Sequence, residues 1–413
     1  MKNLIAKKMK SLFMILGVIG PGLITVNAGN DAGGIATYAA VGASYGYRML
    51  WGLLLITFSL GVIQEMNARM AVVTGKGLSD LIRERFGVKL TFFAITILLI
   101  ANFGVVLGDF AGVAASMELF RISKYMSVPI VAVGIWFLVT KGSYSRVEKI
   151  FLFFTLVFFG YIIAAFLAKP DWVNVFKQMA TPTLKMNTGF LLTFIGLIGT
   201  TITPYMQFYL QSSIVDKHLT LAEYKYEKLD VYIGAFWGNA VSFFIIVCTA
   251  ATLYKAGIAV TSAGTAAASL RPLAGEYAFI LFGVGLFGAS VLAASIIPLS
   301  TSYAICEAFG WESGVDHRIK EAPAFFGIYL ALILLGSLLV LIPGINLMKL
   351  ILITQQIAGL LVPIILTFMI FLVNDKTIMG EYTNTRWQNI IAWITVSFII
   401  VLSLTMFISP CFH

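Results

Sequence analysis

Long apolar stretches separated by short polar segments constrain this sequence more than any other feature. A helix of about 20 apolar residues crosses the hydrocarbon core of a bilayer. The sequence predicts such helices at about 13–40, 47–72, 90–117, 126–140, 147–168, 186–213, 228–254, 275–308, 323–343, 347–373 and 387–409. Charged residues make up only 11% of the 413 residues, whereas a soluble domain needs about 25% to cover its surface. We therefore expect an all-α polytopic membrane protein with about eleven transmembrane helices.

The distribution of Lys and Arg among the loops predicts the orientation of the chain. Cytoplasmic loops carry an excess of basic residues, and with the N-terminus inside the inner loops hold roughly twice as many as the outer loops. The inner set includes Lys76, Arg83, Arg85, Lys141 and Arg318. An odd number of spans then places the C-terminus outside. We expect an N-in, C-out monomer in the cell membrane, most simply a bacterial plasma membrane.

Several classes of protein are excluded by what the sequence lacks. The net charge of +9 comes without a run of Lys and Arg interleaved with aromatic residues, so it does not indicate a nucleic-acid partner. Three cysteines without paired spacing give neither a disulfide framework nor a metal box. The basic N-terminus leads into an apolar stretch that is too long for a cleaved signal peptide. Because no nucleophile, base and metal occur together, we expect no enzyme and no cofactor.

Two of the predicted spans contain residues that break a helix. The first contains Asn27-Ala28-Gly29-Asn30-Asp31-Ala32-Gly33-Gly34, and the sixth contains Gly199-Thr200-Thr201-Ile202-Thr203-Pro204-Tyr205. Interrupted helices at matching positions of two halves are the best sequence indication of a transporter's central binding site. We therefore expect one transmembrane domain over 1–413, with inverted five-helix repeats at about 13–168 and 186–373 and an extra helix at 387–409.

Asp31 is the central candidate residue, because a charge at the bilayer centre costs about 2.5–3.5 kcal/mol. A carboxylate together with carbonyl groups of an unwound segment from Ala28 to Gly34 would offer hard oxygen ligands to a cation. The alternative is that Asp31 caps a helix at a buried break. In the sixth span, Thr200 and Thr203 offer hydroxyl groups to the same site, unless they only hydrogen-bond within a Thr-rich kink.

Other polar residues in the spans are weaker candidates. Gln355 or Gln356 could reach the ion directly or through water, or could instead join two helices. Asp109, with Asn102 at i−7, could be an ion or proton way-station or a polar lining residue. Glu65 and Arg69 at i, i+4 are predicted to pair, as a structural contact or as part of an inner gate. The candidates for an ion pathway or gate are therefore Asp109, Asn102, Asn239, Tyr205, Glu65 and Arg69, with helix-to-helix hydrogen bonding favoured for Asn239.

Three motifs resemble those of the Nramp transition-metal transporters. Gln64-Glu65-Met66-Asn67-Ala68-Arg69, followed by Val73-Thr74-Gly75-Lys76-Gly77-Leu78, resembles the family's second helix and the next loop. Leu270-Arg271-Pro272-Leu273-Ala274-Gly275-Glu276 resembles the start of its eighth helix, and Glu307-Ala308-Phe309-Gly310-Trp311 resembles the end. The resemblance implies a LeuT-type fold, a metal site between helices 1 and 6, and divalent metal uptake coupled to protons.

The sequence departs from the family at the metal site that the resemblance implies. The family's Asp-Pro-Gly-Asn corresponds to Asp31-Ala32-Gly33-Gly34, so Gly34 replaces the Asn ligand. The family's Ala, Met and His in the sixth helix correspond to Thr200, Thr203 and Tyr205, with a slip of one residue as the alternative. Two family Glu residues on the third helix become Asn102 and Gly112, while Asp109 and Gln355 match.

These departures favour a hard cation. A methionine thioether favours transition metals, and Mg²⁺ is held by one or two carboxylates together with retained water. The chain is thus most similar to the Nramp-related magnesium transporters, and we expect a secondary transporter that imports Mg²⁺, and Mn²⁺ as well, by alternating access without proton coupling. The alternatives are a proton-coupled Mn²⁺ or Fe²⁺ transporter, or a cation-coupled organic-solute symporter, which the central Asp31 disfavours.

Overall fold

The computed structural model describes residues 22, 25–26, 29–140, 159–315 and 317–408. Within these residues the regular structure is entirely helical. The longer helices of the first half are α3 (Ala32–Tyr45), α4 (Leu50–Thr74), α5 (Leu78–Leu119), α6 (Lys124–Thr140), α8 (Phe159–Leu167) and α9 (Trp172–Ala180). Those of the second half are α10 (Thr188–Thr201), α11 (Pro204–Asp216), α12 (Tyr224–Thr249), α15 (Ala278–Phe309), α16 (Pro323–Val340), α17 (Leu347–Asn374) and α19 (Arg386–Ile408). Short helices α13 (Ala263–Ala267), α14 (Arg271–Ala274) and α18 (Lys376–Met379) lie in the connections.

The helices confirm the predicted membrane class. Eight of the described helical segments are long and apolar enough to cross a bilayer, and α6 is a shorter apolar helix. The first predicted span and the fifth, at 147–168, lie partly outside the described residues. The total of eleven spans, the orientation and the division into inverted repeats therefore remain predictions.

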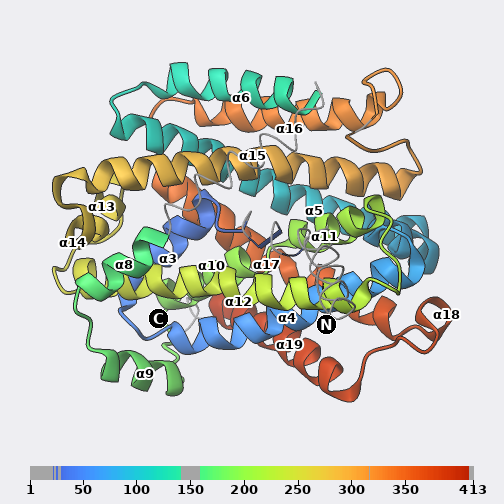
Figure 1. Cartoon of the computed structure of the whole chain (residues 1–413), viewed down its shortest axis with the longest axis horizontal. Coiled ribbons are helices and arrows are strands. Elements are labelled where there is room, and N and C mark those ends of the chain that lie inside the picture. The colour runs from blue at the N-terminus through green and yellow to red at the C-terminus, as the bar shows by residue number, and fades with distance from the viewer. Residues whose placement is uncertain (1–21, 23–24, 27–28, 141–158, 316, 409–413) are drawn as a thin grey trace, which may run out of the picture.

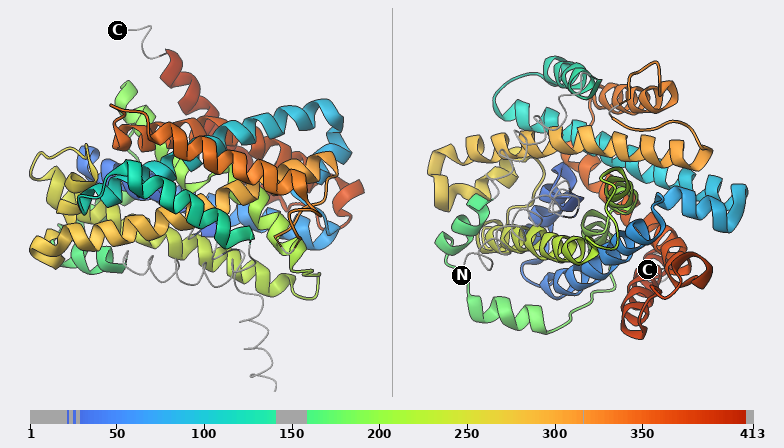
Figure 2. Two further views of the ribbon diagram at one scale, coloured as in Figure 1. Left: turned by 90° about the horizontal axis from the view of Figure 1, so that it is seen from above. Right: turned by 45° about the vertical axis from the view of Figure 1, so that its right-hand side comes forward.

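The long helices enclose a buried centre. In Figure 1, α15 and α5 run between the pair α6 and α16 on one side and the pair α12 and α4 on the other. The right-hand view of Figure 2 shows α3 surrounded by these longer helices. Of the apolar stretch in the α10 and α11 segment 83% is buried, compared with 33% in α19. The α10 and α11 segment therefore packs mainly against other helices, whereas α19 lies at the outside of the bundle.

Glycines allow the central helices to touch. A side chain at Gly199 on α10 would meet the backbone of Gln355 and Gly359 on α17, and one at Gly359 would meet the backbone carbonyl of Ile195. Gly42 of α3 likewise lies against Thr249 of α12. Small residues at such contacts let helix backbones approach closely in membrane proteins.

Both predicted helix breaks occur in the structure. Helix α10 ends at Thr201 and α11 begins at Pro204, whose missing N–H costs nothing at a first helical position. Asp31 precedes the first residue of α3 with an extended backbone. The two breaks are neighbours, because the hydroxyl groups of Tyr38 on α3 and Thr201 on α10 are 3.2 Å apart.

Candidate metal site

Asp31 is the helix cap that the sequence offered as one of its two roles. Its carboxylate accepts a hydrogen bond of 2.6 Å from the backbone N–H of Gly34, and the residue is 2% exposed. A cap satisfies one of the N–H groups that a helix start leaves without a partner. This hydrogen bond uses the Oδ1 atom and fixes the carboxylate at the break. The carboxylate that caps α3 is therefore also buried at the break.

The paired glycines after Asp31 bring two other helices to this carboxylate. A Cβ atom on Gly34 would lie 3.3 Å from the Thr200 hydroxyl oxygen and 2.6 Å from the Gly29 carbonyl oxygen. A Cβ atom on Gly33 would overlap the amide of Gln355. The absence of side chains at both positions therefore gathers a hydroxyl group, a carbonyl group and an amide. Gly34 itself leaves no open space at the break, because Gly29 and Thr200 approach it closely.

A second carboxylate faces the same break from α5. Gly112 packs against Ala32, the first residue of α3, and Asp109 lies one turn before Gly112. Asp109 is fully buried and close enough to Asp31 for the two carboxylates to interact. Helix α5 thus brings the predicted way-station next to the predicted ligand.

Several of these buried polar atoms have no hydrogen-bond partner in the protein. They are Thr200 Oγ1, Gln355 Oε1 and Nε2, both carboxylate oxygens of Asp109, and Asn102 Oδ1. Buried polar groups are normally paired, so each exception requires an explanation such as an ion or a water molecule. Three of these side chains, Asp109 of α5, Thr200 of α10 and Gln355 of α17, lie at one break. Their donors and acceptors suit a cation that is bound partly through water.

The predicted ligand Thr203 and the predicted pathway residue Tyr205 differ in position. The Thr203 hydroxyl donates to the Thr200 carbonyl at 3.2 Å, which is the kink role that the sequence left open. The Tyr205 hydroxyl faces the Thr25 carbonyl at 3.5 Å, across the two broken helices. Of the paired glutamines, Gln355 turns toward α3, whereas Gln356 lies beside Gly196 of α10. Ala28 lies outside the described residues.

The whole described chain matches one family of membrane proteins. The model of the family described as natural resistance-associated macrophage protein-like, Nramp, matches residues 22–409. This chain belongs to the Nramp family. It is 26% identical to the divalent metal cation transporter MntH of Bacillus subtilis, over 97% of this chain and 94% of that protein. It is 29% identical to MntH of Erwinia tasmaniensis over 66% and 68% of the two chains.

Solved structures support the same fold. A manganese transporter of Eremococcus coleocola, in complex with an aromatic bis-isothiourea substituted compound, superposes with a TM-score of 0.75 at 21% identity, covering 96% of this chain and 86% of that chain. Mhp1, a nucleobase-cation-symport-1 family transporter, superposes with a TM-score of 0.59 at 13% identity, covering 95% and 90%. The Nramp chain therefore has the LeuT-type fold that the resemblance implied.

Four other candidate residues of this Nramp chain, Asn102, Asn239, Glu65 and Arg69, make contacts in other parts of the bundle. Asn102 donates to Thr301 of α15 at 2.8 Å, which joins α5 to α15. Asn239 lines a separate groove of about 290 Å³ between α4 and α12, with neighbours such as Leu53 and Phe243. The amide nitrogen of Asn239 has no hydrogen-bond partner, so the helix-to-helix hydrogen bond that the sequence favoured stays a prediction.

Glu65 and Arg69 form the predicted ion pair, with nitrogen and oxygen 3.1 Å apart. The pair also connects α4 to distant segments. Arg69 donates to the Tyr382 carbonyl and to Asn384, and Glu65 accepts from Tyr224 and Gln388. These contacts join α4 to α12 and to the start of α19. The pair therefore links three segments of the chain, and its part in an inner gate stays a prediction.

Two residues at the break were not singled out as ligands by the sequence. Asn30 donates to the Gly238 carbonyl at 3.3 Å and accepts from Ser242, which attaches the break to α12. The methyl group of Met206 on α11 packs against Gly29, with its sulfur 3.8 Å from where a Cβ atom would lie. The glycine-rich segment around Gly29 indicates that another part of the chain approaches closely, but it does not indicate that Met206 does so.

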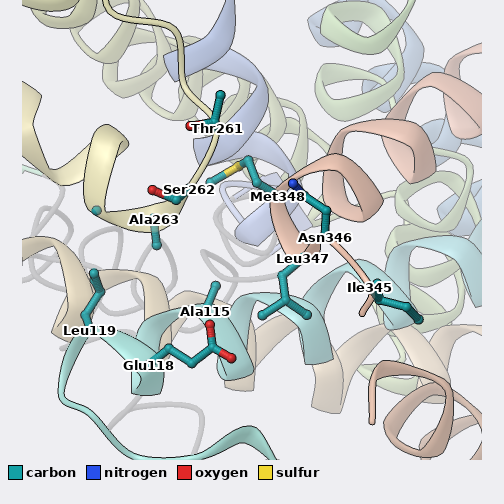
Figure 3. Close-up of a pocket in the computed structure, with 11 residues that line it drawn as sticks. Ala115, Glu118, Leu119, Thr261, Ser262, Ala263, Ile345, Asn346, Leu347 and Met348 are labelled. Atoms are coloured by element: carbon teal, nitrogen blue, oxygen red, sulfur yellow. The ribbon is translucent and has the colours of Figure 1, made fainter. Parts of the chain in front are cut away.

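A cavity of about 440 Å³ lies at the end of α5 that is predicted to face outside. Figure 3 shows its walls, which come from Ala115, Glu118 and Leu119 of α5, from residues 261–264 and from residues 345–348. Glu118 is nine residues beyond Asp109 on the same helix, or about 13 Å at 1.5 Å per residue. The cavity therefore lies on the side of the candidate metal site that the loop charges predict to face outside.

Proposed function

We propose that this Nramp chain is a secondary transporter that imports divalent metal cations by alternating access, with Mg²⁺ preferred and Mn²⁺ also accepted. The observation that carries the proposal is the group of buried polar atoms without protein partners beside Asp31. A bound cation with retained water would satisfy atoms that otherwise carry the cost of desolvation. The names of the bacterial relatives support the broader class of divalent metal cation transporters.

The preference for Mg²⁺ rests on the chemistry of the gathered donors. Asp31, Asp109, Thr200 and Gln355 present carboxylate, hydroxyl and amide oxygens, and Gly29 adds a carbonyl oxygen. Mg²⁺ is usually bound by one or two carboxylates while it keeps several waters. Two carboxylates with neutral oxygens around them match that requirement. We assign Asp31, Thr200 and Gln355 to the ion and Asp109 to its water shell or to the pathway.

The absence of proton coupling is part of the same proposal. The three histidines, His218, His317 and His413, all lie outside the predicted spans. The two family Glu positions on the third helix hold Asn102 and Gly112, and Gly112 packs on Ala32. Import needs no proton gradient, because the membrane potential favours entry of a divalent cation by about 4.6 kcal/mol per 100 mV.

A proton-coupled Mn²⁺ transporter is the second candidate. Met206 favours it, since a thioether beside Gly29 could serve a transition metal from a position that the family motif does not use. The solved relative named a manganese transporter has the same fold. Asp31 and Asp109 together could also bind and release a proton.

The test uses purified protein in proteoliposomes with an inside-negative potential and an internal pH dye. We expect uptake of Mg²⁺ and of Mn²⁺, competition of Mg²⁺ against Mn²⁺, and no internal acidification during either uptake. Acidification that accompanies Mn²⁺ uptake, with no competition by Mg²⁺, would establish the second candidate instead. The same sample supports a mass measurement of the expected monomer.

The cellular location follows from the relatives and the loop charges. The relatives are bacterial, and the described apolar helices indicate a multi-pass membrane protein. We propose a bacterial plasma membrane with the N-terminus in the cytoplasm. Reporter fusions after residue 76 and after residue 262 should report cytoplasm and exterior respectively.

A further inference from the structure

Two family-like motifs that are more than two hundred residues apart meet at one end of the bundle. Glu307 lies in the last turn of α15, and Gly77 immediately precedes α5. A Cβ atom on Gly77 would overlap the Glu307 carboxylate. The carboxylate therefore sits where the chain turns into α5. Loop charges predict that this end of the bundle is cytoplasmic.

The carboxylate of Glu307 supplies what Gly77 cannot. The first N–H groups of a helix lack partners within the helix, and the helix dipole makes that end attractive to an anion. Gly77 has no side chain to cap them, and the backbone of Ser79 faces the Glu307 carboxylate. Glu307 of α15 thus adds a carboxylate at the start of α5, where Asp80 of α5 itself accepts a hydrogen bond of 3.3 Å from the Gly77 N–H.

A third element is attached to the same carboxylate. The Ser212 hydroxyl of α11 donates to Glu307 Oε1 at 2.5 Å. The neighbouring Gln211 donates from its amide to the Lys76 carbonyl at 2.9 Å. Helix α11 is the half of the broken sixth helix that follows the candidate metal site. Its far end is therefore held both by α15 and by the loop before α5.

The charged groups around Glu307 do not hold its carboxylate in place, so its position depends on the contacts with Ser212 and Gly77. The carboxylates of Asp80 and Asp216 are close enough to repel it, and Arg83 lies beside Gly310 at the end of α15. Glu307 Oε2 has no hydrogen-bond partner, and within the described residues Glu307 forms no ion pair. A buried carboxylate held only by hydroxyl and backbone groups can release its partners more readily than one in an ion pair.

We propose that Glu307 is a positioning residue for transport, which holds α11 against α5 and α15 and lets it go when this end of the molecule opens. The inference rests on the proposed function only in taking α11 as a moving part. Because Glu307 touches none of the assigned metal ligands, it acts on the conformational step. Its removal therefore changes the rate of transport more than the metal concentration at half-saturation.

Hydrogen exchange followed by mass spectrometry tests the contacts without any transport. We expect Glu307→Ala to accelerate exchange of the amides at 77–82 and 208–216 by about tenfold, since it removes the carboxylate that accepts from Ser212 and packs against Gly77. Ser212→Ala, a milder change that keeps the cap on α5, should affect only 208–216. Glu312→Ala, at an exposed position five residues later, is the matched control and should leave both segments unchanged.

Transport by the same variants separates a positioning role from a merely structural one. For Glu307→Ala we expect a changed maximal rate of Mg²⁺ uptake with the half-saturating concentration within about twofold, and partial recovery in Glu307→Gln, whose Oε1 can still accept from Ser212. Unchanged exchange at 208–216, or wild-type rates despite faster exchange, would overturn the proposal. If the unmodified protein moves neither Mg²⁺ nor Mn²⁺, the proposed function fails while the exchange data still decide the role of Glu307.

Discussion

At the scale of single residues, Asp31 combines two tasks that substitutions can separate. As a cap it needs only an oxygen that accepts from the Gly34 N–H, and Asn supplies that oxygen as well as Asp does. As a ligand for a divalent cation it needs the negative charge. A capping role alone therefore tolerates Asn, whereas an ion-binding role does not.

We expect Asp31→Asn to keep the thermal stability of the metal-free protein within about 0.5 kcal/mol and to abolish Mg²⁺ uptake. Asp31→Ala should lower stability by about 1 kcal/mol in addition. Melting of the detergent-solubilised protein and uptake into proteoliposomes measure the two effects. Normal uptake by Asp31→Asn would mean that the residue is a cap only.

Met206 is the residue that discriminates between the two candidate functions. Leu keeps the apolar contact with Gly29 and removes the sulfur. If the site is built for Mg²⁺, Met206→Leu should leave the half-saturating concentrations of both metals nearly unchanged. A rise for Mn²⁺ of about tenfold or more, with Mg²⁺ unaffected, would show that the thioether binds the metal and would favour the manganese transporter.

At the scale of helices, close packing of α10 on α17 positions Thr200 and Gln355 together. Gly359 makes this contact against the Ile195 carbonyl, which cannot move without disturbing α10. Gly359→Ala should therefore cost about 1–3 kcal/mol and lower the melting temperature. Gly327→Ala on α16 is the matched control, because open space surrounds that glycine. Equal melting temperatures for the two variants would contradict a tight α10–α17 contact.

The helices show which parts of the fold could be read from the sequence. Long apolar runs predicted the described membrane helices, and Gly, Pro and Thr residues predicted the two breaks. Both kinds of feature can be recognised within a short stretch of sequence. Helix α9 and the first turns of α5, from Leu78 to a kink at Gly87, were not predicted. These segments are short or charged and lie outside the apolar runs. Their helical structure depends on capping, such as Asp171 on α9.

The sequence predicted which residues belong to the candidate site. It did not predict which side of each helix faces that site. Asp31, Thr200 and Gln355 meet because glycines at 33 and 34 remove the side chains between them. The apolar pattern of α17 does not distinguish Gln355 from Gln356, and only the family resemblance favoured Gln355. The pattern of α12 likewise does not indicate that Asn239 faces α4. Those choices are made by packing between helices that are distant in the sequence.

At the scale of the whole molecule, the outer cavity and the candidate metal site lie along one helix. Glu118 contributes the only acidic side chain among the residues that line this cavity. A negative charge at the mouth of a pathway raises the local concentration of cations, and added salt screens the effect beyond about 10 Å at 0.1 M. A cation that approaches from outside would meet Glu118 before Asp109.

We therefore expect Glu118→Gln to raise the half-saturating Mg²⁺ concentration at low ionic strength and to leave the maximal rate unchanged, because the metal ligands are untouched. The difference should shrink toward zero in about 0.5 M of a monovalent salt, where exposed charges are strongly screened. Glu276→Gln removes an exposed carboxylate that does not line the cavity, and it should behave as the unmodified protein. An effect of Glu118→Gln that persists in high salt would mean direct coordination of the metal at the cavity, whereas no effect at low salt would place the path of the ion elsewhere.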